Sequence, residues 1–396
     1  MINHNDYGAF INPSMTLSLN TSGPLSGLKF ALKDVFAVKG YKNSAGNPTW
    51  LTYADEATEH ADVVNQLLHH GATLVGTTVT DELMYSLKGD NKHYPPTINP
   101  KAPDSFTGGS SSGSAVSVAS HQTDFSIGTD TGGSVRIPSS YCGLFGMRPS
   151  HGLISMNGVI PLAPSFDTVG WMANHADILA KVGDVLLPDQ TVHAYKTIYV
   201  FQKAFDLLQD SDDIAYYHKL LQLLNDRYTL KSVDLLDNHS FHELTECFRI
   251  LQGKEAWQSH GQWINQYHPD FSKDISGRFE MASKIKEDVH YHLMLQTKQN
   301  FTTEMHQLLG SDSLVIIPTT VGSAPSRESS FSSIESLRAQ TMKLTCLAGL
   351  SGLPQITRPL LHTKKPLGLS FISGYNTDKQ LLQFVRNVDL SGLKGI

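Results

Sequence analysis

The chain has 396 residues, of which 40% are hydrophobic and 17% charged, and its formal net charge is −6 at pH 7. This length and composition suffice to bury one large core or two fused lobes. The negative charge argues against a nucleic-acid-binding surface, which relies on clustered Lys and Arg, and the three cysteines form no disulfide framework, as expected in a reducing compartment.

The sequence shows no pattern for export or membrane insertion. The stretch Met1 to Tyr7 has no basic segment followed by an apolar core, so we expect no secretory signal. No uninterrupted apolar run is long enough to span a bilayer. We therefore expect a cytoplasmic protein without a membrane partner.

Strands and helices alternate in the first part of the chain. Residues 28–32 predict a buried strand that ends at Lys33, residues 61–68 an amphipathic helix that Gly71 stops, and residues 73–77 a second buried strand. Such alternation favours a largely parallel sheet. We therefore predict an α/β fold with a large mixed, mostly parallel central sheet covered by helices on both faces.

A proline-rich loop and two glycine-rich segments follow. Residues 84–105 predict a loop, and the Gly/Ser segment 108–114 runs directly into the apolar stretch 115–119, which suits a buried helix capped by the serines. A flexible linker is the alternative, but linkers are not normally fused to a core helix. Residues 124–127 predict a strand that leads into Gly-Thr-Asp-Thr-Gly-Gly-Ser at 128–134.

Ser110 and Ser134 lie in these two glycine-rich segments. A serine hydroxyl is a weak nucleophile at neutral pH and needs a base, and a lysine can be that base only when burial or nearby positive charge makes it neutral. Lys33 is placed for this role, because desolvation at the end of a buried strand lowers its pKa from about 10.4. The alternative is a lysine that reaches solvent or pairs with Asp34.

The glycines before Ser134 point to an oxyanion site. They permit backbone angles that aim successive N–H groups into one concavity. Acyl transfer needs such donors because the carbonyl oxygen becomes negatively charged in the tetrahedral transition state. The segment does not resemble a phosphate loop, because it lacks the Gly-x-x-x-x-Gly-Lys-[Ser/Thr] spacing.

Two motifs carry a family resemblance. Gly-Gly-Ser-Ser-Ser-Gly-Ser-Ala-Val at 108–116 and Gly-Thr-Asp-Thr-Gly-Gly-Ser-Val-Arg at 128–136 resemble the core motif of the amidase signature hydrolases. Ser-Tyr-Cys-Gly-Leu-Phe-Gly at 140–146 and Arg-Pro-Ser-His-Gly at 148–152 are similar to the plant-type indole-3-acetamide hydrolases of that family.

The resemblance implies roles for individual residues. It assigns the nucleophilic attack to Ser134 and the oxyanion donors to the backbone of Thr131, Gly132, Gly133 and Ser134. Ser110 maps onto the family's bridging serine, which relays the proton between lysine and nucleophile and follows a cis peptide bond. The predicted catalytic residues are therefore Lys33, Ser110 and Ser134.

Three other chemically suggestive features are assigned structural roles. The 18 histidines fit no metal-binding pattern, so we expect no metal and no cofactor. Cys142 lies in an apolar context that favours a buried structural cysteine over a thiol nucleophile. Arg136 could bind a substrate carboxylate, but we expect it to bind backbone carbonyls or an acid such as Asp130.

The second half of the chain is less uniform. Residues 188–310 predict a divergent helical cap, and the family pattern returns at 314–319, 347–354 and 366–374. Because strands at 314–317 and 368–372 would return to the sheet begun at residue 28, we predict a single amidase domain over 1–396.

Three classes of function remain open. The first, which we favour, is an amidase that hydrolyses a small carboxamide, of the aryl or indole acetamide kind, to acid and ammonia through a Ser-Ser-Lys acyl-enzyme mechanism. The second is an amidotransferase A-type subunit that releases ammonia from glutamine, and the third is a noncatalytic interaction protein of the same fold. We expect a small-molecule amide as partner and no nucleic acid, and we leave a homodimer open. The wall of the substrate pocket should come from the cap and the loops near 84–100 and 319–346.

Overall fold

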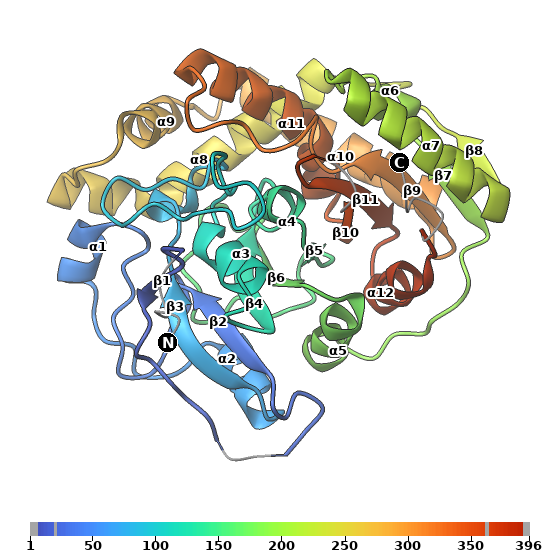
Figure 1. The fold of residues 1–396 in the computed structure, drawn as a ribbon. Helices are drawn as coiled ribbons and strands as arrows, with labels where there is room; N and C mark the ends of the chain where they lie inside the picture. Colours follow the sequence, from blue (N-terminus) through green and yellow to red (C-terminus); the bar gives the residue numbers. More distant parts are fainter. Residues whose placement is uncertain (1–6, 20–21, 361–363, 391–396) are drawn as a thin grey trace.

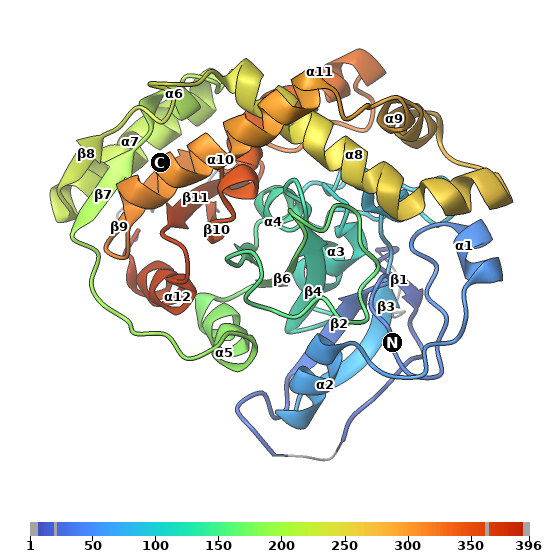
Figure 2. The ribbon, with the colours of Figure 1, turned by 180° about the vertical axis from the view of Figure 1, so that it is seen from behind.

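A single large sheet organises the chain. The computed structural model describes residues 7–19, 22–360 and 364–390, so the expectation of no secretory signal rests mostly on residues outside the described ones. Within the described part, an 11-stranded sheet has the order β1-β3-β2-β4-β6-β5-β10-β11-β9-β7-β8. Helices lie on both of its faces (Figures 1 and 2).

The elements have the following bounds. The strands are β1 (Phe10–Asn12), β2 (Lys29–Lys33), β3 (Thr73–Thr78), β4 (Phe125–Asp130), β5 (Phe145–Arg148), β6 (Thr168–Ala173), β7 (Thr197–Val200), β8 (Leu230–Ser232), β9 (Ser313–Pro318), β10 (Gln355–Leu360) and β11 (Leu367–Ser373). The helices are α1 (Pro48–Tyr53), α2 (Asp62–His69), the 3-10 helix η1 (Glu82–Met84), α3 (Ser112–Ala119), α4 (Arg136–Cys142), α5 (Ala176–Leu186), α6 (Gln202–Phe205), α7 (Ser211–Arg227), α8 (Phe241–Tyr267), α9 (Lys273–Ser283), α10 (Val289–Leu309), α11 (Phe331–Ser351) and α12 (Asp378–Asn387).

The strands and helices predicted from the sequence are confirmed within a few residues. The predicted loop at 84–105 follows η1 and carries no further helix or strand. The predicted helix at 115–119 begins earlier, at Ser112, and the serine cap is wrong: the Ser111 side chain makes no capping bond. The Ser111 hydroxyl instead donates to the Thr129 carbonyl (3.3 Å), which attaches the start of α3 to β4.

The α/β class is confirmed, but the expectation of a mostly parallel sheet is wrong. Of the ten described strand pairings, only β2–β3, β2–β4, β7–β8 and β7–β9 are parallel. A parallel pair needs a crossover of a dozen or more residues, usually a helix. β10 ends at Leu360 and β11 begins at Leu367, which leaves too short a connection and makes this pair antiparallel.

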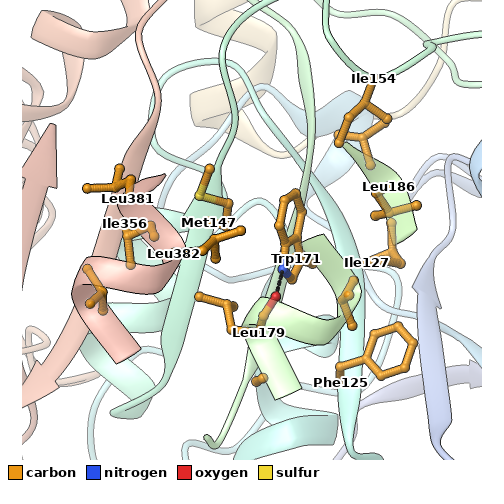
Figure 3. Packing of buried hydrophobic residues seen from close by; sticks show 14 of the residues in the cluster. Phe125, Ile127, Met147, Ile154, Trp171, Leu179, Leu186, Ile356, Leu381 and Leu382 are labelled. Carbon is orange, nitrogen blue, oxygen red and sulfur yellow. Dashed lines mark hydrogen bonds between the residues drawn. The ribbon is translucent and has the colours of Figure 1, made fainter. Parts of the chain in front are cut away.

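Two groups of helices enclose the sheet. Figures 1 and 2 place α8, α9, α10 and α11 together on one side, away from α2, α5 and α12. On the α5 and α12 side, the buried Trp171 of β6 donates its indole N–H to the Leu179 carbonyl (2.9 Å). Figure 3 shows this bond among Met147, Ile356 and Leu382, whose apolar side chains pack in the core between helices and strands.

The stretch 188–310 contains strands as well as helices. β7 and β8 extend the sheet beyond β9 through parallel pairing, and the sequence pattern did not predict them. Helices α8 and α10 pack with α11 and with the apolar side of α4 in a second core. The single domain over 1–396 stays a prediction. Among the described residues, no helix combines the length and apolar character that a membrane crossing requires.

Candidate active site

Lys33 is the last residue of β2 and is completely buried. Its Nζ lies 2.7 Å from Ser110 Oγ and 2.8 Å from Thr129 Oγ1. Lys33 therefore neither reaches solvent nor forms a hydrogen bond with Asp34, whose Oδ2 accepts from the Ser44 backbone and hydroxyl instead. The structure brings two of the three predicted catalytic residues into direct contact.

The surroundings of Lys33 favour its neutral form. Burial lowers the pKa of Lys33 to about 7, because a charged ammonium loses its hydration, while the negative charges of Asp81, Asp130 and Asp167 oppose this shift. A substantial fraction of Lys33 is consequently unprotonated at neutral pH. This is the state that a general base requires.

Ser110 is positioned by its backbone as well as by Lys33. The Gly109–Ser110 peptide bond is cis, as the family resemblance implied. The Gly109 N–H donates to the Leu87 carbonyl (3.0 Å), and the Ser110 carbonyl accepts from the Asp81 N–H (3.2 Å). A Cβ at Gly109 would lie 2.5 Å from Asp81 Oδ2, so only glycine fits beside this buried carboxylate.

Ser134 lies in the loop between β4 and α4 and is 3% exposed. Its carbonyl accepts the Ser111 N–H (3.3 Å), which joins the two serine loops. Among the described residues its hydroxyl has no hydrogen-bond partner, whereas the Ser110 hydroxyl accepts from Lys33 Nζ. Gly133 has φ +126°, a backbone conformation that favours glycine, and this turns the chain immediately before Ser134.

The four predicted oxyanion donors are not equivalent. The Gly133 N–H already donates to Asp130 Oδ1 (3.0 Å). Within the described chain, the N–H groups of Thr131, Gly132 and Ser134 have no acceptor. These three therefore remain available for an oxyanion, whereas Gly133 contributes its conformation and its bond to Asp130.

Asp130 is the centre of a buried ionic cluster below this loop. Arg136 donates from Nε to Oδ2 (3.0 Å) and from Nη2 to Oδ1 (2.7 Å), and Arg148 Nη1 donates to Oδ1 (3.0 Å). Although burial by itself raises the pKa of Asp130, the two guanidinium groups hold it well below its ordinary value. Arg136 also reaches the Thr345 carbonyl and Gln355 (both 2.7 Å), which confirms the structural role expected for it.

Removal of Arg136 should destabilise the fold. We expect Arg136→Ala to lower the free energy of unfolding by about 3–5 kcal/mol, because it leaves the buried Asp130 carboxylate undercompensated. Urea unfolding followed by circular dichroism measures this loss. The control is Arg249→Ala, whose arginine is half-exposed and pairs with Glu246 on the same helix; it should cost less than about 1 kcal/mol. Equal losses in the two variants would contradict the prediction.

A small apolar pocket adjoins both serine loops. It is lined by Leu87, Lys88, Ile137, Tyr141, Pro325, Ile334, Leu337, Arg338 and Thr341. Ile137 and Tyr141 flank the catalytic backbone, since a Cβ at Gly133 would meet Ile137 and one at Gly108 would meet Tyr141. The cavity measures about 30 Å³, room for about one water molecule, so an acyl group enters only when side chains around it move.

The sequence predicted that the pocket wall would come from the cap and from two loops, and the structure agrees only for the loops. The loops near 84–100 and 319–346 contribute Leu87 and Leu337, among others, while none of its lining residues comes from 188–310. Phe248 of α8 instead covers the oxyanion loop, with its ring 3.1 Å from the place of a Cβ on Gly132. The cap region therefore shields the loop and leaves the pocket wall to α4, α11 and the loops that carry Leu87 and Pro325.

The structure also bears on the roles predicted for Cys142 and for the histidines. Cys142 is buried, burial raises its pKa to about 12, and its thiol donates to the Thr107 carbonyl (3.4 Å), which confirms an inert structural cysteine. Within the described ranges, no three His, Cys, Asp or Glu side chains gather in a way that could hold a metal ion.

Sequence reasoning missed several residues that shape the site. Thr129, one of the two hydroxyls on Lys33, lies inside the quoted Gly-Thr-Asp motif and could have been found there. Asp81 comes from a segment without a recognisable pattern, whereas Arg148 begins the quoted Arg-Pro-Ser-His-Gly motif but was given no role there. Only the fold brings these two residues to Ser110 and Asp130.

Known proteins resemble this chain over most of its length. The family model described as Amidase matches residues 14–247. The chain is 38% identical to Amidase 1 of Arabidopsis thaliana over 97% of this chain and 98% of that protein. It is 31% identical to Translocon at the outer membrane of chloroplasts 64 of Pisum sativum over 97% of this chain and 70% of the relative.

The fold has a similar match among solved structures. A crystal structure of amidase superposes with a TM-score of 0.82 at 25% identity and covers 92% of this chain and 85% of that one. The chain therefore belongs to the amidase signature family. It is a hydrolase that acts on amide bonds.

Proposed function

We propose that this enzyme hydrolyses a small carboxamide, of the aryl or indole acetamide kind, to a carboxylic acid and ammonia through an acyl-enzyme on Ser134. The observation that carries this proposal is the buried contact between Lys33 Nζ and Ser110 Oγ, next to a loop in which the Ser134 hydroxyl bonds to none of the described residues. The apolar lining of the pocket beside that loop would suit an aryl or alkyl group once the side chains around the small cavity move.

In the first half-reaction, Ser134 Oγ attacks the amide carbonyl carbon. The Ser134 proton passes to Ser110 Oγ while the Ser110 proton passes to the neutral Lys33 amine, so that one proton moves in total. The carbonyl oxygen becomes negative and is stabilised by the N–H groups of Thr131, Gly132 and Ser134. When the C–N bond breaks, the relay returns the proton to the leaving nitrogen, which departs as ammonia.

In the second half-reaction, water attacks the acyl group on Ser134. The water gives its proton to the same relay, and the relay returns a proton to Ser134 Oγ as the C–O bond to the enzyme breaks. The products are the carboxylic acid and the free enzyme. The apolar surroundings of Lys33 favour this cycle because they keep the amine neutral between turnovers.

A screen for ammonia release tests the proposal. Purified protein is incubated with indole-3-acetamide, phenylacetamide, short aliphatic amides, urea derivatives and glutamine. We expect the aryl and indole acetamides to be the best substrates. A profile dominated by glutamine would favour the amidotransferase-type alternative, and the absence of any release would contradict the proposed activity.

Ser110 should be less critical than the nucleophile. We expect Ser110→Ala to lower kcat by about 10²–10⁴-fold, because a water molecule can partly replace a relay hydroxyl. Steady-state kinetics on the best amide of the screen measures the loss. Ser112→Ala is the matched control, since Ser112 is the first residue of α3, two positions after Ser110, and among the described residues its hydroxyl makes only a long bond to the Val79 carbonyl (3.4 Å). A Ser110→Ala enzyme as fast as wild type would rule out the relay.

A further inference from the structure

One arginine in the wall of the apolar pocket lacks a hydrogen-bond acceptor. Arg338 lies on α11 among the lining residues, and its buried Nε–H is without an acceptor among the described residues. Its nearest acid is Glu335, with Nη1 3.7 Å from Oε2, which exceeds hydrogen-bond distance. A buried guanidinium N–H without a partner is unfavourable, so the position favours a ligand that supplies the missing acceptor.

The neighbouring charges are already paired. Arg278 donates from Nη2 to Glu335 (2.9 Å) and from Nη1 to the Tyr85 carbonyl (2.8 Å), so Glu335 is bound more closely by Arg278 than by Arg338. Lys88, the other cation in the wall, donates to Asp90 (2.7 Å). Arg338 is therefore the cation of this pocket whose hydrogen-bonding capacity is least used.

The charge of Arg338 persists at neutral pH. Burial and the nearby Arg278 lower its pKa to about 10, which still leaves the guanidinium protonated. A protonated guanidinium binds a carboxylate through two parallel N–H···O bonds. The rest of the pocket is mostly apolar, with Leu87, Ile137 and Leu337 in its wall.

We propose that Arg338 is a specificity-determining residue that binds a carboxylate carried by the acyl group of the substrate, at the end of an apolar spacer. The inference rests on the proposed function: when the leaving group is ammonia, the acyl group is the part of the substrate that fills the pocket. Within the proposed class of small amides, the preferred substrates then carry a carboxylate at the far end of the acyl group, as arylacetamides with a carboxylate and monoamides of apolar dicarboxylic acids do.

Paired substrates test this inference. The wild-type enzyme is assayed for ammonia release with monoamides of the linear dicarboxylic acids from butanedioic to octanedioic acid, each beside the unsubstituted amide of the same chain length. We expect kcat/KM to favour the carboxylated amide by about tenfold or more at the chain length that reaches Arg338, because binding sites discriminate strongly through buried polar groups.

Variants then assign the preference to Arg338. Arg338→Met should remove it by raising KM for the carboxylated amide about tenfold or more, with the plain amide changed little. Arg338→Lys, which keeps the charge but not the forked donors, should retain part of it. Arg249→Met is the matched control: it removes a nearby cation that does not line the pocket and should leave the preference intact.

Binding provides a readout that is independent of turnover. Hexanedioate should raise the melting temperature of the wild-type protein and of Arg249→Met, but not that of Arg338→Met. Equal kcat/KM for both amides in wild type, or equal losses on both in Arg338→Met, would overturn the inference while the proposed function stands. If no amide releases ammonia, the proposed function fails, and the melting experiment still decides whether Arg338 binds a carboxylate.

Discussion

Ser134→Ala is expected to abolish turnover while the fold is retained. The substitution removes the attacking oxygen, and among the described residues it breaks no hydrogen bond of the hydroxyl. The loss in kcat should therefore be on the order of 10⁶-fold without a change in the unfolding midpoint. Only a covalent route predicts that this oxygen carries the acyl group. Intact-mass analysis after treatment with a fluorophosphonate should show one adduct on wild type and none on the variant.

The control for this experiment is Ser126→Ala. Ser126 lies on β4, in the strand that leads to the Ser134 loop, and its buried hydroxyl also has no partner in the part of the chain that the structure describes. This variant should keep both the rate and the label. An adduct that persists in Ser134→Ala, or a Ser134→Ala enzyme with wild-type rate, would show that another residue is the nucleophile.

The rate should rise with pH through the titration of Lys33. Because burial lowers the pKa of Lys33 to about 7, the amine is protonated and inactive below this pH and neutral above it. We expect kcat/KM to increase along a limb with its midpoint near that value and then to level off. The apparent midpoint belongs to the coupled Lys33, Ser110 and Ser134 unit rather than to the lysine alone.

Substitutions of Lys33 test whether this residue, and not another, is the general base. Lys33→Ala should lower kcat/KM by about 10²–10⁴-fold and flatten the limb. Lys33→Arg should be no better, because a guanidinium stays protonated and cannot accept a proton. A histidine base would titrate at about 6.5, which is too close to the pKa of Lys33 for the midpoint of the limb to tell the two bases apart. The pH profile of Lys33→Ala makes this distinction instead. An unchanged limb in Lys33→Ala would rule out Lys33, and Lys29→Ala, at the exposed start of the same strand, serves as control.

The pairing of the sheet shows where local sequence patterns stop being informative. Apolar runs identified β2, β3, β9 and β11 because burial on both faces of a strand leaves a continuous hydrophobic signal. Strand direction depends on connections and neighbours, and the short connection between β10 and β11 already excluded a parallel pair there. β7 and β8 were missed because both strands are short, bury few side chains and leave a weak pattern.

The oxyanion loop shows that sequence patterns also fail to predict individual hydrogen bonds. The glycines before Ser134 indicated a concavity of N–H donors, but the sequence does not tell which donors are already in use. The fold places Asp130 so that it takes the Gly133 N–H, which leaves Thr131, Gly132 and Ser134. Arg338 had no motif at all, and only the packing of α11 against α4 brings it into the pocket wall.

The sequence by itself determined the serine loops, the strand that ends at Lys33 and the family resemblance, because glycine content, apolar runs and residue spacing are local properties of the chain. The tertiary structure alone decided that Lys33 Nζ meets Ser110 Oγ across 77 residues of chain, that its pKa falls, and that Asp81 and Arg338 lie beside the site. These outcomes depend on burial and on contacts between distant segments, and such contacts form only when the sheet assembles.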